Sequence, residues 1–257
     1  MLEFNQLDTR RGHLPPIDLI ALDADDTLLH TESLYVEVQK TFTEAFSPDY
    51  SPAYVQSVLD EIEGANIPYY GYGIKAFMLS MIETSARLSN GKLDSSRVSL
   101  VIELGKRMLA SEISLLDQVQ QTLETLADAY PLIVITKGDL LDQQAKLEKS
   151  GIKNYFKYIE VVTEKKAETY ASLIRKLNVA PANFLMVGNS LRSDILPVVE
   201  IGAHAVYIPY HTSWVHEQVQ LSPEQVGLFH ELEHLYQLPE LLSALENKEI
   251  INEDDHE

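Results

Sequence analysis

Short apolar runs that end in polar residues recur along the chain and predict the strands of a parallel sheet. The runs are rich in β-branched residues, which is typical of strands that are buried on both faces. Their residue ranges are 17–22, 132–135, 158–162, 184–187 and 205–208. Segments beside these runs place apolar residues at helical spacing, at 119–130, 140–150 and 168–177. Strands that alternate with helices in this way predict βαβ units and an α/β fold.

The strand pattern disappears between Asp26 and about Leu116, where the apolar residues follow helical spacing only. Helices are predicted at 34–46, 53–62, 74–88 and 96–111. An all-helical insert after the first strand predicts a separate cap that lies over the strand ends. We therefore expect a core domain of residues 1–28 and 117–257 and a helical cap domain of residues 29–116.

Residues 68–73 combine three tyrosines with two glycines inside this predicted cap. We predict that they connect two helices and that their tyrosines pack the cap. A loop that closes over a substrate, with Lys75 nearby, is the alternative interpretation.

Polar residues that follow the predicted strands are the candidates for chemistry, because the carboxyl ends of parallel strands meet at one edge of the sheet. Asp23, Asp25 and Asp26 follow the first strand, and three neighbouring carboxylates repel one another unless a cation neutralises them. On an extended segment Asp23 and Asp25 point to the same side, so one can attack while the other transfers a proton. A polar turn in which Asp26 and Thr27 cap the next helix is the structural alternative.

The sequence Asp23-Ala24-Asp25-Asp26-Thr27-Leu28 resembles the first signature of the haloacid dehalogenase-like hydrolase superfamily. Thr136, after an apolar run, is similar to the second motif of this family, and Lys165 or Lys166 to the lysine of the third. The segment 188–195 resembles the acidic fourth motif. The four motifs occur in the family's order, which makes their combination specific.

The resemblance covers roughly residues 18–209 and implies an α/β fold with a Rossmann-like, three-layer core around a central parallel sheet. It also implies an all-helical cap inserted after the first strand, which is the family's first cap class. The cap is matched in character only.

The resemblance further implies the roles of the site residues. Asp23 would be the nucleophile that takes the phosphoryl group, and Asp25 the general acid and base. Thr136, aided by the backbone amide of Lys137, would hydrogen-bond the phosphoryl oxygens, and a lysine would offset charge between nucleophile and phosphate.

We prefer Lys165 for the lysine role. It lies five residues before Tyr170, a spacing that resembles family members without the proline form of this motif. Lys166 remains the alternative.

A metal site is implied by the same resemblance, with Mg²⁺ as the cofactor. The implied ligands are Asp23, the backbone carbonyl of Asp25, and a side chain of the fourth motif. Asn189 stands where an aspartate often begins that motif, and its amide oxygen can bind Mg²⁺ without adding charge. Asp194 would then supply the charge, directly or through a water. A helix N-cap is the alternative role for Asp194.

Composition excludes several other classes of protein. The formal charge of −19 repels nucleic acid and anionic membranes, so neither is expected as a partner. The absence of cysteine excludes disulfides, thiolate catalysis and cysteine metal sites. Residues 1–16 contain no apolar run typical of a signal peptide, and we expect a cytoplasmic protein. The sequence carries no signal for an oligomeric state.

The resemblance implies a Mg²⁺-dependent hydrolase, a phosphatase of a small phosphorylated metabolite that forms an aspartyl-phosphate on Asp23. A phosphoglucomutase-like phosphotransferase is an alternative, because the same acid and base serve both reactions. A haloacid dehalogenase shares the nucleophile but needs neither metal nor a second acid, so Asp25 argues against it. A catalytically silent binding module conflicts with the presence of Asp23, Asp25, Thr136 and a lysine.

Overall fold

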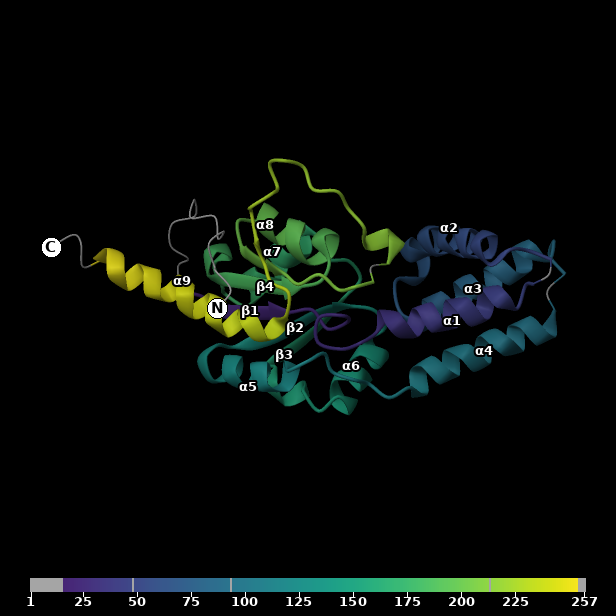
Figure 1. The fold of residues 1–257 in the computed structure, drawn as a ribbon, viewed down its shortest axis with the longest axis horizontal. Coiled ribbons are helices and arrows are strands. Elements are labelled where there is room, and N and C mark those ends of the chain that lie inside the picture. The colour runs from purple at the N-terminus through teal and green to yellow at the C-terminus, as the bar shows by residue number, and fades with distance from the viewer. Residues whose placement is uncertain (1–15, 48, 93, 213, 254–257) are drawn as a thin grey trace.

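The computed structural model describes residues 16–47, 49–92, 94–212 and 214–253 and is drawn as a ribbon in Figure 1. Residues 1–15, on which the expected absence of a signal peptide rests, lie outside this description. Among the described residues, no helix combines the length and the apolar character needed to cross a lipid bilayer.

A six-stranded parallel sheet in the order β3-β2-β1-β4-β5-β6 forms the centre of the core. The strands are β1 (Leu19–Leu22), β2 (Leu132–Lys137), β3 (Tyr158–Val162), β4 (Phe184–Gly188), β5 (His204–Tyr207) and β6 (His230–Glu231). The first five confirm the predicted strands to within two residues at each end. The hydrophobic pattern does not reveal β6, which is two residues long.

Helices cover both faces of this sheet, which gives the three layers that the α/β prediction expects (Figure 1). On one face lie α5 (Val119–Ala129), α6 (Leu140–Lys149) and α9 (Leu238–Glu253). On the other face lie α7 (Ala167–Lys176) and α8 (Leu196–Glu200).

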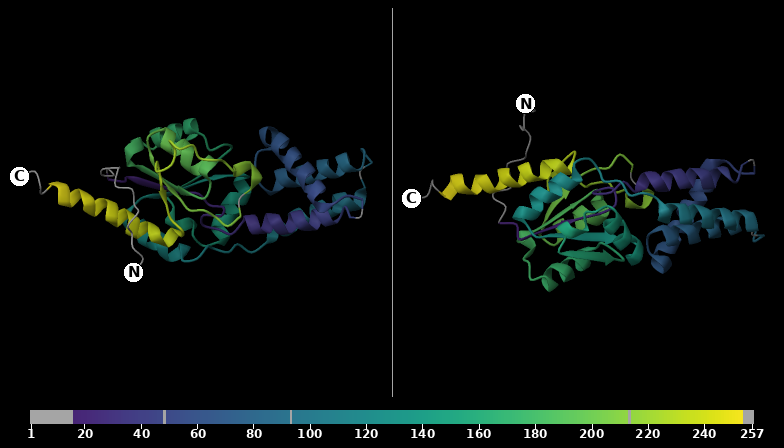
Figure 2. Two further views of the ribbon diagram at one scale, coloured as in Figure 1. Left: turned by 45° about the horizontal axis from the view of Figure 1, so that its top comes forward. Right: turned by 90° about the horizontal axis from the view of Figure 1, so that it is seen from below.

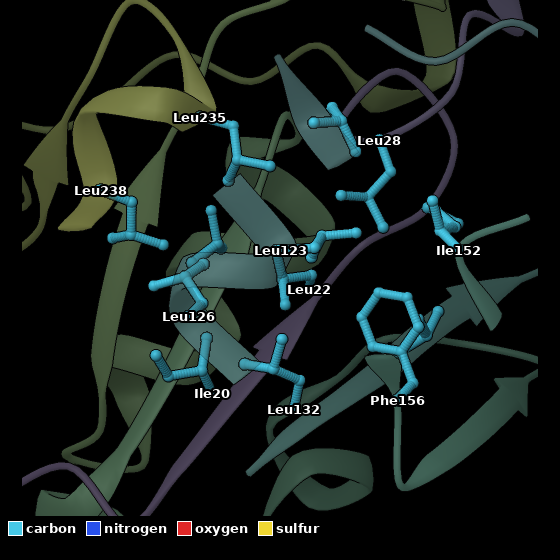
Figure 3. Packing of buried hydrophobic residues seen from close by; sticks show 14 of the residues in the cluster. Ile20, Leu22, Leu28, Leu123, Leu126, Leu132, Ile152, Phe156, Leu235 and Leu238 are labelled. Atoms are coloured by element: carbon cyan, nitrogen blue, oxygen red, sulfur yellow. The ribbon is translucent and has the colours of Figure 1, made fainter. Parts of the chain in front are cut away.

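Neighbouring residues of β1 belong to different hydrophobic clusters, because successive side chains of a strand point to opposite faces. Ile20 and Leu22 join the cluster under α5 and α9, and Figure 3 shows them close to Leu123 and Leu126 of α5. Ala21 joins the cluster under α7 and α8. Both clusters are buried, so β1 is covered on both faces and tolerates no polar side chain until it ends.

The strand register brings the ends of the central strands to one edge. Leu22 is level with Val134 in β2 and with Val187 in β4. The residues that follow these positions, among them Asp23, Thr136 and Asn189, therefore leave the sheet at neighbouring points.

Four helices inserted after β1 pack around a hydrophobic cluster of their own, in which Phe42, Leu59, Met81 and Leu104 are almost completely buried. They are α1 (Glu32–Glu44), α2 (Pro52–Tyr70), α3 (Ile74–Leu88) and α4 (Ser95–Ala110), and we call them the helical cap. All views show them beyond the sheet, at the end of the molecule opposite to α9 (Figures 1 and 2). The domain limits at 28/29 and 116/117 remain predictions.

The prediction for residues 68–73 is wrong in part, because α2 continues to Tyr70 and contains Pro68. Tyr69 and Tyr70 are 81% and 51% exposed and therefore do not pack the cap. Gly64 does not break the helix: a Cβ atom there would lie 2.9 Å from Cε1 of His216, so this glycine makes room for a core loop. The helix ends at Gly71, whose φ of 69° lies in the left-handed region that favours glycine.

Candidate active site

Asp23 and Lys165 form a buried ion pair at the carboxyl end of the central strands. The backbone N–H of Asp23 still donates to the carbonyl of Val187 at 2.9 Å, so the residue is held by the sheet. The Lys165 ammonium donates to the carboxylate of Asp23 and, at 2.7 Å, to Oδ1 of Asp194. Lys166 is exposed and begins α7. Of the two candidate lysines, the fold brings Lys165 to Asp23.

Asp194 turns back toward the sheet. It lies in a π-helical turn, Leu191–Ile195, for which Ser190 is the N-cap. The backbone N–H of Ser190 donates to Oδ2 of Asp194 at 3.0 Å. A Cβ atom at Gly188 would lie 2.3 Å from Cγ of Asp194, so this approach requires glycine. The alternative of Asp194 as an N-cap is wrong, because its carboxylate faces Lys165.

Of the remaining polar side chains of the first motif, Asp26 caps a helix and Thr27 contacts a residue of the candidate site. Asp26 accepts hydrogen bonds from the backbone N–H groups of Thr31 and Glu32 at 2.9 and 3.0 Å and thus caps the start of α1. Thr27 instead donates to Oδ1 of Asn189 at 3.3 Å. The capping alternative is therefore right for Asp26 and wrong for Thr27.

Buried negative charge exceeds positive charge around Asp23. Burial raises the pKa of Asp23 to about 7 against the effect of Lys165, and the neighbouring Asp194 raises it further. Burial alone would lower the pKa of Lys165, but Asp194 and Asp23 together raise it, so the ammonium stays charged. One ammonium thus serves two buried carboxylates, and an additional cation would be stabilised here.

The oxygen atoms at this position fit Mg²⁺. Asp23 and Asp194 offer carboxylates and Asn189 an amide oxygen, which are the hard ligands that this cation binds. Within the described part of the chain, no three Asp, Glu, His or Cys side chains form a ready metal cluster. Mg²⁺ does not need one, since it usually keeps several waters and binds one or two carboxylates.

Asp25 is held by three donors that the sequence did not reveal as a group. Its carboxylate accepts from Thr31 Oγ1 and Gln143 Nε2, both at 2.7 Å, and from Lys146 Nζ at 3.1 Å. Burial favours the neutral form, but Lys146, Gln143 and Thr31 hold the pKa of Asp25 below its usual value. Gln143 and Lys146 share one face of α6, where their spacing reads as part of an ordinary amphipathic helix.

Thr136 and Lys137 end β2 beside Asp25. Thr136 is buried, and its hydroxyl donates to the carbonyl of Lys137 at 3.3 Å. The Lys137 ammonium pairs with Glu217, donates to Ser193 Oγ at 2.9 Å and lies 4.2 Å from the ring centroid of Tyr72. The Lys137 side chain therefore connects the carboxyl end of β2 with the helical cap.

A cavity of about 170 Å³ connects the strand ends with the helical cap. Its core wall contains the candidate residues Asp23, Asp25, Thr136, Lys165, Asn189 and Asp194. The loop after β5 adds Trp214 and Glu217, and the cap adds Tyr72, which packs edge-on against Trp214. No hydrophobic or charge pattern marks this loop in the sequence, so sequence reasoning finds no role for Trp214.

Comparison with known proteins agrees with this geometry. A family model described as haloacid dehalogenase-like hydrolase matches residues 17–202. A crystal structure of a haloacid dehalogenase-like family hydrolase from Xanthomonas campestris is 33% identical, with a TM-score of 0.78, and the match covers 92% of this chain and 94% of that one.

Two curated relatives come from Escherichia coli, and by name one is a nucleotidase and the other a phosphatase. The pyrimidine 5'-nucleotidase YjjG is 26% identical over 239 residues, which cover 88% of this chain and 97% of the relative. The 5-amino-6-(5-phospho-D-ribitylamino)uracil phosphatase YigB is 24% identical over 206 residues, which cover 75% of this chain and 83% of the relative.

Proposed function

The chain belongs to the haloacid dehalogenase-like hydrolases, and from this premise we propose that it is a Mg²⁺-dependent phosphatase of a small phosphorylated metabolite. The observation that carries the proposal is the buried Asp23–Lys165–Asp194 group, which opens into the same cavity as Asp25. The names of two relatives, a nucleotidase and a phosphatase, support the same reaction class.

In the first half-reaction, an oxygen of the Asp23 carboxylate attacks phosphorus and forms an aspartyl-phosphate. The bond between phosphorus and the ester oxygen breaks, and that oxygen takes a proton from the Asp25 carboxyl group. Thr136 and the backbone amide of Lys137 hydrogen-bond the phosphoryl oxygens, and the charge of Lys165 offsets the repulsion between carboxylate and phosphate.

In the second half-reaction, a water molecule gives a proton to the Asp25 carboxylate and its oxygen bonds to phosphorus. The bond between phosphorus and the Asp23 oxygen breaks, which releases phosphate and restores both aspartates. The same residue thus serves as acid and then as base.

Asp25 must first be protonated, although Gln143, Lys146 and Thr31 stabilise its anion. A phosphate dianion that enters the cavity brings negative charge next to Asp25. Nearby like charge raises the pKa of a carboxyl group, so the substrate itself favours the protonated form.

We propose that Mg²⁺ is held by Asp23, the backbone carbonyl of Asp25, Asn189 and Asp194. When bound, the cation neutralises charge on the phosphoryl group and aligns it with the nucleophile. Asp194 accepts from Lys165 and from Ser190, and these hydrogen bonds fix the orientation of its carboxylate before a cation arrives.

The mutase and dehalogenase alternatives share the nucleophile. Asp25, with its three donors, supports reactions that need proton transfer to a leaving oxygen, which carbon–halogen hydrolysis does not. The high negative charge supports the absence of nucleic acid and anionic membrane partners. The cytoplasmic location stays a prediction from the sequence.

The test measures phosphate release from p-nitrophenyl phosphate and from a panel of phosphorylated metabolites, with Mg²⁺ or with excess chelator. Asp23→Asn should lower kcat/KM by at least about a thousandfold, because it removes the nucleophile. Asp128→Asn, an exposed aspartate of α5, is the matched control and should behave as wild type. If the folded wild type hydrolysed none of these phosphates, the proposal would be contradicted. Assays of halide release from haloacids and of phosphosugar isomerisation would then test the two alternatives.

A further inference from the structure

The cap wall of the cavity contains a carboxyl group that the proposed chemistry does not use. Glu63 lies in the middle of α2, lines the cavity and is 8% exposed. Its Oε2 atom is buried and has no hydrogen-bond partner among the described residues. Buried polar groups in native proteins are nearly always hydrogen-bonded, so this atom calls for a partner.

Leaving this carboxyl group unpaired is costly. Burial, reinforced by Asp60 and Glu32, raises the pKa of Glu63 to about 8. An unsatisfied buried polar group loses its hydrogen bonds to water on folding and gains none in return. A ligand that supplies the missing hydrogen bond in the cavity would recover this cost.

Neighbouring polar groups of the cap do not meet this need. The amide of Asn66, one turn after Glu63, already donates to Ser80 Oγ at 3.2 Å and to Glu83 Oε2 at 2.9 Å. Ile67 and Phe77 add apolar surface to the same wall. Glu63 therefore shares the cap wall of the cavity with an amide that is already paired and with apolar side chains.

The positive charges of the cavity wall belong to the core and not to the helical cap. Of the described residues that line the cavity, the cations are Lys137, Lys146 and Lys165, all from the core. Each is already paired with a carboxylate. The helical cap instead contributes Glu32 and Glu63 to the cavity wall. A second anionic group on the substrate would therefore find no unpaired cation among the described residues of the cavity wall.

We propose that Glu63 is a specificity-determining residue that hydrogen-bonds a hydroxyl of an uncharged, polyhydroxylated leaving group, and that this cavity rejects leaving groups ending in a carboxylate or second phosphate. A hydroxyl donates to a carboxylate and also accepts from a carboxylic acid, so it suits either protonation state of Glu63. The inference rests on the proposed phosphatase function and names its substrate class.

The experiment compares three five-carbon phosphate esters that differ only in the leaving group: ribitol 5-phosphate, pentyl phosphate and 5-phosphoribonate. The wild type should hydrolyse ribitol 5-phosphate with a kcat/KM at least about tenfold above that for pentyl phosphate, since an unpaired Glu63 disfavours the hydroxyl-free chain. It should show a similar preference over 5-phosphoribonate, because a second anion that is buried without a cationic partner is unfavourable.

Glu63→Leu should lower kcat/KM for ribitol 5-phosphate by about 10- to 100-fold and leave that for pentyl phosphate within about threefold. Glu63→Gln keeps both size and an acceptor oxygen, so it should retain most of the preference for the hydroxylated chain. Glu61→Leu, on the same helix but 66% exposed at its side chain and outside the cavity, is the matched control and should leave all three values unchanged. Thermal unfolding confirms that each variant is folded. If Glu63→Leu does not fold, Glu63→Ala, which also removes the carboxyl group, takes its place with the same expected loss.

Equal wild-type efficiency on the three esters, or an equal loss on all three in Glu63→Leu, would overturn the inference. Hydrolysis of p-nitrophenyl phosphate distinguishes a failure of the proposed role of Glu63 from a failure of the proposed phosphatase function. If p-nitrophenyl phosphate is hydrolysed while the esters are not distinguished, only the role of Glu63 fails. If neither it nor any ester is hydrolysed, the phosphatase function fails as well.

Discussion

Lys165 is a single residue on which the balance of charge at the carboxyl ends of the strands depends. Its ammonium contacts two carboxylates, and its side chain is 2% exposed. The two aspartates repel each other, and the Lys165 ammonium offsets this repulsion in the folded protein. In the proposed reaction it would also offset the repulsion between Asp23 and a phosphate. Its neighbour Lys166 makes the useful contrast, since it has the same chemistry in an exposed position.

Lys165→Met should destabilise the metal-free protein by about 3 kcal/mol, because removing one partner leaves buried charges uncompensated. It should also lower kcat/KM for p-nitrophenyl phosphate by at least about a hundredfold. Urea unfolding and initial rates measure the two effects. Lys166→Met should change stability by less than about 0.5 kcal/mol, and a comparable loss in both variants would argue against a special role for Lys165.

Glu63 predicts a pH dependence of stability. Its pKa rises from an ordinary 4.5 to about 8 in the folded state, so folding is favoured by the proton that it binds. This contribution is complete below pH 4.5 and is lost as the pH rises toward 8, and Asp60 and Glu32, which face Glu63, act in the same direction.

Glu63→Gln removes this titration. Its advantage in free energy of unfolding over the wild type should therefore grow by about 2–4 kcal/mol between pH 5 and pH 8. Urea unfolding at both pH values measures it. A difference that stays constant with pH would show that Glu63 titrates normally.

At the scale of elements, the contacts between the helical cap and the core come from helix ends and loops. The Tyr72 hydroxyl donates to Glu164 at 3.0 Å, and Lys75 pairs with Asp139 at 2.9 Å. His216 in the loop after β5 lies 3.0 Å from the carbonyl of Asp60. These contacts hold α2 and α3 over the cavity, and with α2 they hold Glu63 in the cavity wall.

Pro68 makes α2 weaker than its length suggests. A proline inside a helix removes one backbone hydrogen bond and costs up to about 3 kcal/mol relative to alanine. Pro68 is exposed, so Pro68→Ala should raise stability by about 1–2 kcal/mol without changing packing. Thermal unfolding measures the gain. An unchanged or lower Tm would mean that the last turn of α2 is already frayed.

At the scale of the whole molecule, the sheet and the helical cap have separate hydrophobic clusters and meet at a cavity rich in carboxylates. The cation that balances these charges would bind only the folded state, because Asp23, Asn189 and Asp194 come from different parts of the chain. Binding of this kind raises the stability of the whole protein.

Mg²⁺ at 100 times its Kd should therefore stabilise the wild type by about 2.7 kcal/mol, seen as a rise in Tm. Asp194→Asn keeps the shape of the side chain but removes a charge, so the rise should be clearly smaller. NaCl at equal ionic strength controls for general salt effects. A rise of equal size in Asp194→Asn would exclude this residue as a ligand.

The hydrophobic pattern determined the first five strands, most helices, and the convergence of Asp23, Thr136 and Asn189 at the carboxyl ends of the strands. It succeeded because burial on both faces and the parallel arrangement act on every strand in the same way. The first motif also identified Asp23 and Asp25 as candidates, since neighbouring carboxylates after a buried strand are unfavourable without a partner.

Tertiary structure alone decided which side chains meet. It brings Lys165 and not Lys166 to Asp23, supplies Gln143 and Lys146 to Asp25 from more than a hundred positions away, and turns Glu63 into the cavity. These contacts depend on how distant elements pack against each other. Apart from the preference for Lys165, local spacing does not indicate these contacts, because an amphipathic helix has the same pattern whether its polar face meets solvent or a reacting group.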